Sequence, residues 1–205
     1  MITNNTIASA AATLLFISAF LAQPAFAEGD VDSGRELGYS CLGCHGIEGY
    51  NNVYPTYHVP RLGGQKRAYV ESALRAYRDG TRKHPTMAAQ GGSLSDSDIE
   101  NVGAWLEGFG TATDSTTAES VAGIKAAQTC VACHGEAGVG VVPQPPTLSG
   151  QHQDYLKVAL KQYQEGTRSG TVMSAFAAML SEDDIEAVTR YYSSQDGLTT
   201  PSTKD

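Results

Sequence analysis

The sequence predicts an all-helical protein built from two tandem domains, and an internal repeat is the main reason. Residues 60–65 (PRLGGQ) correspond to residues 146–151 (PTLSGQ), and residues 80–82 correspond to residues 166–168 (both GTR), at an offset of 86. Apolar side chains recur at helical spacing in each half, and no segment shows the alternation typical of a strand. A stretch rich in Gly, Thr and Ser at residues 110–120 separates the halves.

Each half contains the same three expected helices. The first, residues 32–41 or 121–130, leads into a cysteine. The second carries an apolar stripe at residues 70–77 or 156–163. The third begins at Ser95 or Ser181, each followed three residues later by Asp in a capping-box pattern. We expect the small residues of the first helices to pack near large aromatic residues of the last: Gly38 near Trp105, and Ala127 near Tyr191.

The first residues are predicted to be a signal peptide. An apolar run over residues 7–22 ends in an A-x-A cleavage pattern at residues 25–27. Residues 1–6 contain no Lys or Arg, so an uncleaved N-terminal anchor remains the alternative. The expected organisation is a signal peptide (1–27), an N-terminal domain (28–110), a linker (111–120), a C-terminal domain (121–197) and a flexible tail (198–205).

The composition argues against nucleic acid as a partner. The chain has 205 residues, of which 41 % are hydrophobic, and a formal net charge of −8. Neutralising phosphates needs a basic surface, which this chain lacks as a whole. The composition and charge predict an acidic soluble protein.

Two copies of a five-residue motif decide the chemistry. Residues 41–45 (CLGCH) and 130–134 (CVACH) both read C-x-x-C-H, the attachment sequence for c-type haem, and together they use all four cysteines. Two thiols at this spacing add to the two vinyl groups of one haem, and the next residue ligates the iron from below. The sequence therefore predicts two covalently attached haem c groups. The predicted attachment residues are Cys41, Cys44, Cys130 and Cys133, and the predicted proximal ligands are His45 and His134.

Other uses of the cysteines fit less well. A thioredoxin-like redox pair does not need the following His, and a zinc site leaves the repeated order of Cys, Cys and His unexplained. Two disulfides would be ordinary in an exported protein, but they leave the repeated motif unexplained as well. Haem attachment also places the protein in the periplasm, in agreement with the signal peptide.

The sixth ligand of each iron separates a carrier from an enzyme. Two strong protein ligands close the iron and suit it to electron transfer. Met87 and Met173 occupy equivalent positions, five residues after the matching GTR segments, and are the predicted sixth ligands. His84 remains an alternative because it is so near Met87. Met179 aligns with a serine in the other half, so we expect it to fill the core under the last helix.

The proximal histidines need a partner for their second ring nitrogen. Pro60 and Pro146 follow the two motifs and open the matching Pro-x-Leu segments. We expect their backbone carbonyls to accept hydrogen bonds from His45 and His134.

These segments together resemble cytochrome c4. The paired C-x-x-C-H motifs, the P-x-L-x-G-Q segment, the GTR before a Met and the L-S-x-x-D-I opening of the last helix occur in order in both halves. The resemblance implies two class I cytochrome c domains related by a pseudo-twofold, with haem propionates near their interface. It also implies electron transfer toward a terminal oxidase at the periplasmic face of the inner membrane. Carried over by position, the iron ligands are His45 with Met87 and His134 with Met173.

The expected function is therefore electron transport in a respiratory chain. A quinol-oxidising complex is the expected donor, a terminal oxidase the expected acceptor, and peripheral contact with the inner membrane stays open. A dihaem peroxidase or a sulfur-compound dehydrogenase subunit is the rival, but such an enzyme needs a displaceable ligand and groups that handle substrate protons. Both halves supply Met instead.

One charged segment suggests a docking surface. Residues 61–83 carry seven basic and two acidic side chains, whereas residues 147–169 carry three and two. The excess predicts either a surface for an acidic partner or a solvated helix face with no such role.

Overall fold

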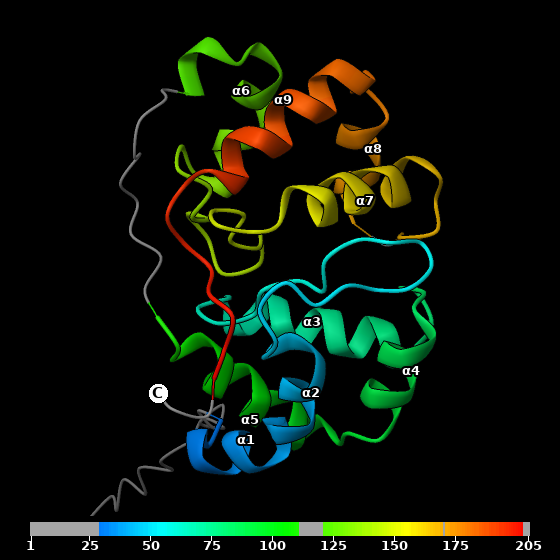
Figure 1. Ribbon diagram of the computed structural model, residues 1–205, viewed down its shortest axis with the longest axis vertical. Coiled ribbons are helices and arrows are strands. Elements are labelled where there is room, and N and C mark those ends of the chain that lie inside the picture. The colour runs from blue at the N-terminus through cyan, green and yellow to red at the C-terminus, as the bar shows by residue number, and fades with distance from the viewer. Residues whose placement is uncertain (1–28, 111–120, 170, 203–205) are drawn as a thin grey trace, which may run out of the picture.

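The computed structural model describes residues 29–110, 121–169 and 171–202, which form two helical domains stacked one above the other (Figure 1). The expected signal peptide and linker lie outside these residues. The N-terminal domain contains α1 (Val31–Gly38), η1 (Tyr39–Cys41), α2 (Leu42–His45), α3 (Arg67–Arg78), α4 (Pro85–Gly92) and α5 (Asp96–Glu107). The C-terminal domain contains η2 (Val121–Gly123), η3 (Lys125–Ala127), α6 (Gln128–His134), α7 (Gln153–Gln164), α8 (Met173–Ala177) and α9 (Glu182–Ser193).

The last helix of each domain starts as the sequence predicts. The Ser95 hydroxyl accepts from the Asp98 backbone N–H at 3.2 Å, and the Asp98 carboxylate accepts from the Ser95 N–H at 2.9 Å. Ser181 and Asp184 repeat this pair at 3.2 and 3.0 Å. Two backbone donors without an intrahelical partner are thereby satisfied at the start of α5 and again at the start of α9. Both capping boxes are confirmed.

Each domain has its own core. In the N-terminal domain α1, α3 and α5 pack together, and a Cβ placed on Gly38 would lie 2.1 Å from a ring carbon of Trp105. In the C-terminal domain the fully buried Ala127 belongs to the same core cluster as Tyr191. The small residues thus pair with the aromatic residues as expected. The close contact in the first domain leaves no room for a side chain at residue 38.

The start of the C-terminal domain differs from the prediction. Instead of one helix over residues 121–130, the chain forms two short 3-10 turns, η2 and η3, before α6 begins at Gln128. The break falls at Ile124, whose backbone angles (φ −108°, ψ 90°) lie outside the helical region. The prediction of a single helix over residues 121–130 was therefore wrong.

The two domains meet through a symmetric set of hydrogen bonds. The Gln65 amide donates to the Thr147 carbonyl at 3.0 Å and accepts from its N–H at 2.9 Å. Gln151, the repeat counterpart of Gln65, makes the same two bonds with Arg61, both at 2.9 Å. Because Arg61 and Thr147 are also counterparts, the two halves exchange identical contacts. This is the pseudo-twofold that the resemblance implied, and α3 and α7 line its two sides (Figure 1).

The C-terminal segment crosses back to the first domain. Leu198 is 3 % exposed, and its N–H donates to the Ser149 carbonyl at 2.8 Å. Thr199 and Gly63 then exchange backbone hydrogen bonds of 2.9 and 3.0 Å. Residues 198–202 are therefore a strap between the domains and not the expected flexible tail, because their apolar and backbone groups find partners. Residues 203–205 lie outside the described part of the chain.

None of the described helices is both long enough and apolar enough to cross a membrane.

Candidate functional site

The two cysteine pairs lie on helical segments that end at His45 and His134, the predicted proximal ligands. Cys41 ends η1 and Cys44 lies in α2, whereas Cys130 and Cys133 both lie in α6. Residues three apart on a helix are neighbours on its surface, so each pair presents two thiols on one side. No disulfide joins these four cysteines, and each is partly exposed. Burial raises the pKa of the first thiol of each pair, at Cys41 and Cys130.

Both proximal histidines are oriented by a proline carbonyl. The Nδ1 atom of His45 lies 2.8 Å from the Pro60 oxygen, and Nδ1 of His134 lies 3.0 Å from the Pro146 oxygen. An Nδ1–H that donates to a carbonyl fixes the tautomer in which Nε2 keeps its lone pair. Burial lowers the pKa of both rings, although the carbonyls oppose this, so the neutral form that ligates a metal is favoured. The predicted proline acceptors are confirmed.

The two expected sixth ligands lie at matching places on short helices. Met87 is in the first turn of α4 and packs against the N-terminal core, while Met173 opens α8. The rival His84 is the residue before α4, and its Nδ1 accepts the Met87 N–H at 3.4 Å. His84 therefore caps the helix that carries Met87.

Met179 is not where the sequence placed it. It is 67 % exposed, so the expectation that it fills the core is wrong. The helix α8 already ends at Ala177, and the fully buried Ala177 occupies the inward position of this segment. Met179 follows in a turn that directs its side chain outward.

A crossed pair of arginines lies between the domains. The Arg82 guanidinium donates to the Tyr155 hydroxyl of the other domain at 2.8 Å, and Arg168 donates to the Tyr69 hydroxyl at 2.6 Å. The backbones of the two arginines also pair in antiparallel fashion. Each guanidinium lies over a tyrosine ring of its own domain, 4.4 Å from the centroid for Arg82 and 4.5 Å for Arg168. Burial raises the pKa of Tyr69, but the two arginines outweigh it and lower that pKa overall.

The crossed arginines are functional candidates that the sequence did not reveal. Both are buried, 8 % and 6 % exposed, and no carboxylate lies within 4.0 Å of either among the residues described. A buried cation without an anion is costly, and arginine is well suited to carboxylates. The repeated GTR segment was the available signal. Two buried guanidiniums without a carboxylate partner, between two domains that each carry a haem-attachment motif, fit the propionates of two haem groups.

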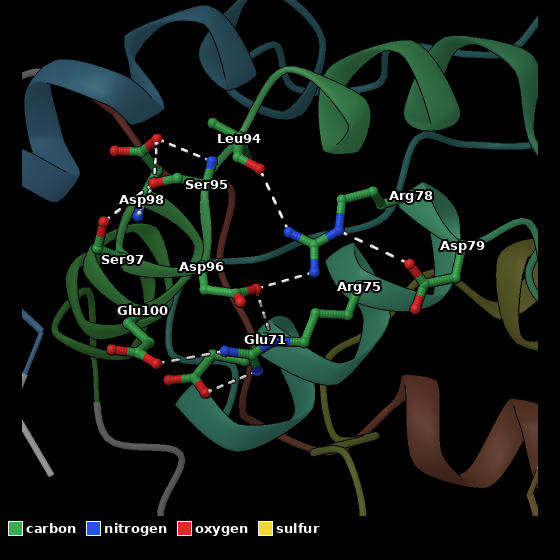
Figure 2. Close-up of polar contacts among 10 residues, drawn as sticks. All are labelled: Glu71, Arg75, Arg78, Asp79, Leu94, Ser95, Asp96, Ser97, Asp98 and Glu100. Carbon is green, nitrogen blue, oxygen red and sulfur yellow. Dashed lines mark hydrogen bonds and ion pairs between the residues drawn. The ribbon is translucent and has the colours of Figure 1, made fainter.

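Four of the seven basic side chains in residues 61–83 pair with carboxylates: Arg61, Arg67, Arg75 and Arg78. Figure 2 shows Arg75 and Arg78 of α3 held by acidic side chains of their own domain: Arg78 bonds Asp96 at 2.8 Å, and Arg75 bonds Glu71 at 3.2 Å and Glu100 at 3.4 Å. Arg67 also pairs with Glu71, at 2.6 Å. These contacts favour the solvated helix face over the docking surface, because the acids come from α3 itself and from α5.

The geometry defines a class of protein. Two helical domains, each with a C-x-x-C-H cysteine pair and a carbonyl-oriented histidine, constitute a c-type cytochrome with two covalently attached haem groups.

The comparisons with known proteins agree. Residues 120–196 match the family described as cytochrome c, and residues 30–106 match the family described as cytochrome c oxidase, cbb3-type, subunit III. Cytochrome c4 of Pseudomonas aeruginosa is 32 % identical over 82 % of this chain and 89 % of its own length. The thiosulfate dehydrogenase electron acceptor of Stutzerimonas stutzeri (strain A1501) is 32 % identical over 75 % and 77 %. Reduced recombinant cytochrome c4 from Pseudomonas stutzeri superposes with a TM-score of 0.66 at 29 % identity, over 82 % of this chain and all of that structure.

The chain belongs to the cytochrome c4 family, and like the named members it is a dihaem electron carrier.

Proposed function

We propose that this protein carries electrons in the periplasm between membrane-bound complexes of a respiratory chain, with each iron ligated by one His and one Met. The ligand pairs are His45 with Met87 and His134 with Met173. The observation that carries the proposal is the matched hydrogen bond from His Nδ1 to a proline carbonyl in both domains, at 2.8 and 3.0 Å. This hydrogen bond leaves Nε2 free to ligate the iron, in His45 and equally in its repeat counterpart His134.

The residues of the chain do four things in this function. The cysteine pairs bind the haems, and the prolines orient the histidines. The two buried guanidiniums at the domain interface place positive charge where propionates fit. Met87 and Met173 close the sixth position, which excludes small ligands. The haem irons, when bound, supply the one-electron change between ferric and ferrous states.

The test uses the holoprotein purified with both haems. We expect low-spin spectra in both oxidation states, a near-infrared sulfur-to-iron absorption in the oxidised protein, and no reaction of the reduced protein with carbon monoxide. A high-spin component or a carbon monoxide adduct would contradict closed His–Met ligation and favour the enzyme alternatives.

The expected donor is a quinol-oxidising complex and the expected acceptor is a terminal oxidase. A second candidate donor follows from one relative, which is named as a thiosulfate dehydrogenase electron acceptor. Reduction of the oxidised holoprotein separates the two. Fast reduction by a quinol-oxidising complex in membranes, with none by thiosulfate and a purified thiosulfate dehydrogenase, supports the respiratory role, and the reverse result supports the second candidate.

A further inference from the structure

The most informative asymmetry lies at one pair of repeat positions, residues 66 and 152. Each is the residue before an interfacial helix, Lys66 before α3 and His152 before α7. Lys66 extends across the interface, where its ammonium donates to the carbonyl of Gly140 and, at 2.7 Å, to that of Val142. His152 instead stacks on His58, with ring centroids 4.6 Å apart. The two halves thus place different charges at equivalent points.

The segment that Lys66 holds adjoins the second haem-attachment motif. The Val141 N–H donates to the Cys133 carbonyl at 3.2 Å. A Cβ placed on Gly140 would lie 3.2 Å from the Lys66 ammonium and 3.3 Å from the Cys133 carbonyl oxygen, so the glycine fits between them.

The charge of Lys66 has no direct counterion in the described part of the chain. No carboxylate lies within 4.0 Å of the ammonium among those residues, and its bonded partners are two neutral carbonyls. Partial burial lowers the pKa of Lys66, and the more distant Glu107 raises it. A half-buried cation whose field is not cancelled by a neighbouring anion acts over a longer range than an exposed ion pair.

We propose that Lys66, supplied by the N-terminal domain, is a positioning residue for the second haem that holds residues 140–142 in place and raises the reduction potential of the iron at His134. The inference rests on haem attachment at residues 130–134 and on the carrier function. On reduction, ferric iron gains one electron and loses one unit of positive charge. A nearby fixed cation therefore favours the ferrous state.

The test compares three variants of the full-length holoprotein. Lys66→Met removes the charge, Lys66→Arg keeps it, and Lys161→Met removes the charge of an exposed lysine that pairs with Glu182 at 2.8 Å. Proton signals of the axial methionine methyl groups follow each haem separately during a redox titration, and loss of one signal in Met173→Ala assigns the second haem. We expect Lys66→Met to lower the potential of the second haem only, Lys66→Arg to restore it, and Lys161→Met to change neither.

Three results would overturn the proposal. These are equal shifts in Lys66→Met and Lys161→Met, a shift of the first haem in place of the second, or a shift in Lys66→Arg as large as in Lys66→Met. If Lys66→Met fails to incorporate haem, Lys66→Gln, which removes the charge and keeps an N–H donor group, gives the same comparison. Absence of methionine methyl signals from the unaltered protein would contradict the ligation proposed above and not the role of Lys66, whose effect would then be measured from the visible absorption bands.

Discussion

The contacts between the two domains are symmetric at the centre of their interface and asymmetric at its edges. At the centre, Arg82 contacts Tyr155 and Arg168 contacts Tyr69, so the same side chains meet twice across the pseudo-twofold. Away from this centre the matching positions are a lysine in one half and a histidine in the other. A duplicated domain can therefore keep the same contacts at the centre of its interface while other matching positions carry different side chains and different charges.

The edge near the first haem is built around an insertion. Pro60 follows His45 by 15 residues, whereas Pro146 follows His134 by 12. The longer segment brings His58 to Asp154 of the other domain, with 2.7 Å between Nδ1 and the carboxylate. Two histidines and an acid meet there, yet among the described residues no group of three such side chains could hold a metal ion. One edge of the interface therefore has a hydrogen-bonded pair of His58 and Asp154, whereas the matching edge has the ammonium of Lys66.

The largest expected effect tests whether both domains use the equivalent methionine. Met173→Ala removes the proposed sixth ligand, so we expect the second iron to open, its potential to fall, and about half of the near-infrared sulfur-to-iron absorption to disappear. Met179→Leu is the matched control. Because Met179 is largely exposed, we expect the spectra and stability of the Met179→Leu variant to stay close to those of the unaltered protein. Loss of the band in Met179→Leu, with retention in Met173→Ala, would show that the repeat alignment fails at this position.

The second prediction concerns how each domain fits its first helix against its last. Gly38→Ala places a methyl group against the Trp105 ring, 2.1 Å from a ring carbon if nothing moves, and overpacking of this kind costs about 1–3 kcal/mol of unfolding free energy. Ala127→Gly in the other domain removes a buried methyl group and costs about 1 kcal/mol. Urea denaturation of the holoproteins, followed by circular dichroism, measures both. An unchanged or increased stability of Gly38→Ala would contradict the tight contact.

Sequence patterns predicted the features that depend on neighbouring residues or on the repeat. The capping boxes need only Ser and Asp three residues apart, and the proline carbonyls follow from a segment present in both halves. The features missed depend on tertiary contacts. The order of residues does not indicate that Arg82 contacts a tyrosine of the other domain or that residues 198–202 bond to the first domain. It also does not indicate that α8 ends early enough to expose Met179.

The third prediction tests the symmetry at the centre of the interface. Arg82→Gln and Arg168→Gln each remove a buried guanidinium that bonds a tyrosine hydroxyl, and a hydrogen bond to a charged group contributes about 1.5–3 kcal/mol. We expect similar losses from the two variants in urea denaturation. Pairing Arg82→Gln with Tyr155→Phe in a double-mutant cycle isolates the crossed contact, since coupled residues give losses that do not add. If only one of the two variants lost much unfolding free energy, the two crossed contacts would not contribute equally to stability despite their matching geometry.

The smallest effect concerns pH at the edge of the interface near the first haem. Burial lowers the pKa of His152, Arg61 and His58 lower it further, and Asp154 and Glu48 oppose them. The folded chain therefore disfavours protonated His152, the unfolded chain binds more protons, and the free energy of unfolding falls as pH drops through the ordinary value of 6.5.

Burial raises the pKa of Asp154, but the hydrogen bonds from His58 outweigh burial and lower this pKa. The stabilisation from Asp154 is therefore lost only as pH falls below 3.8. His152→Gln should reduce the loss near pH 6.5, where His84, whose pKa is also lowered by burial and by Arg82, still contributes, and should keep the loss in acid. Urea denaturation on either side of pH 6.5 would measure both. Lys66→Arg, altered at the matching position of the other half, should keep the full pH dependence. An unchanged profile in His152→Gln would mean that the stacked histidines do not distinguish the two sides of the interface.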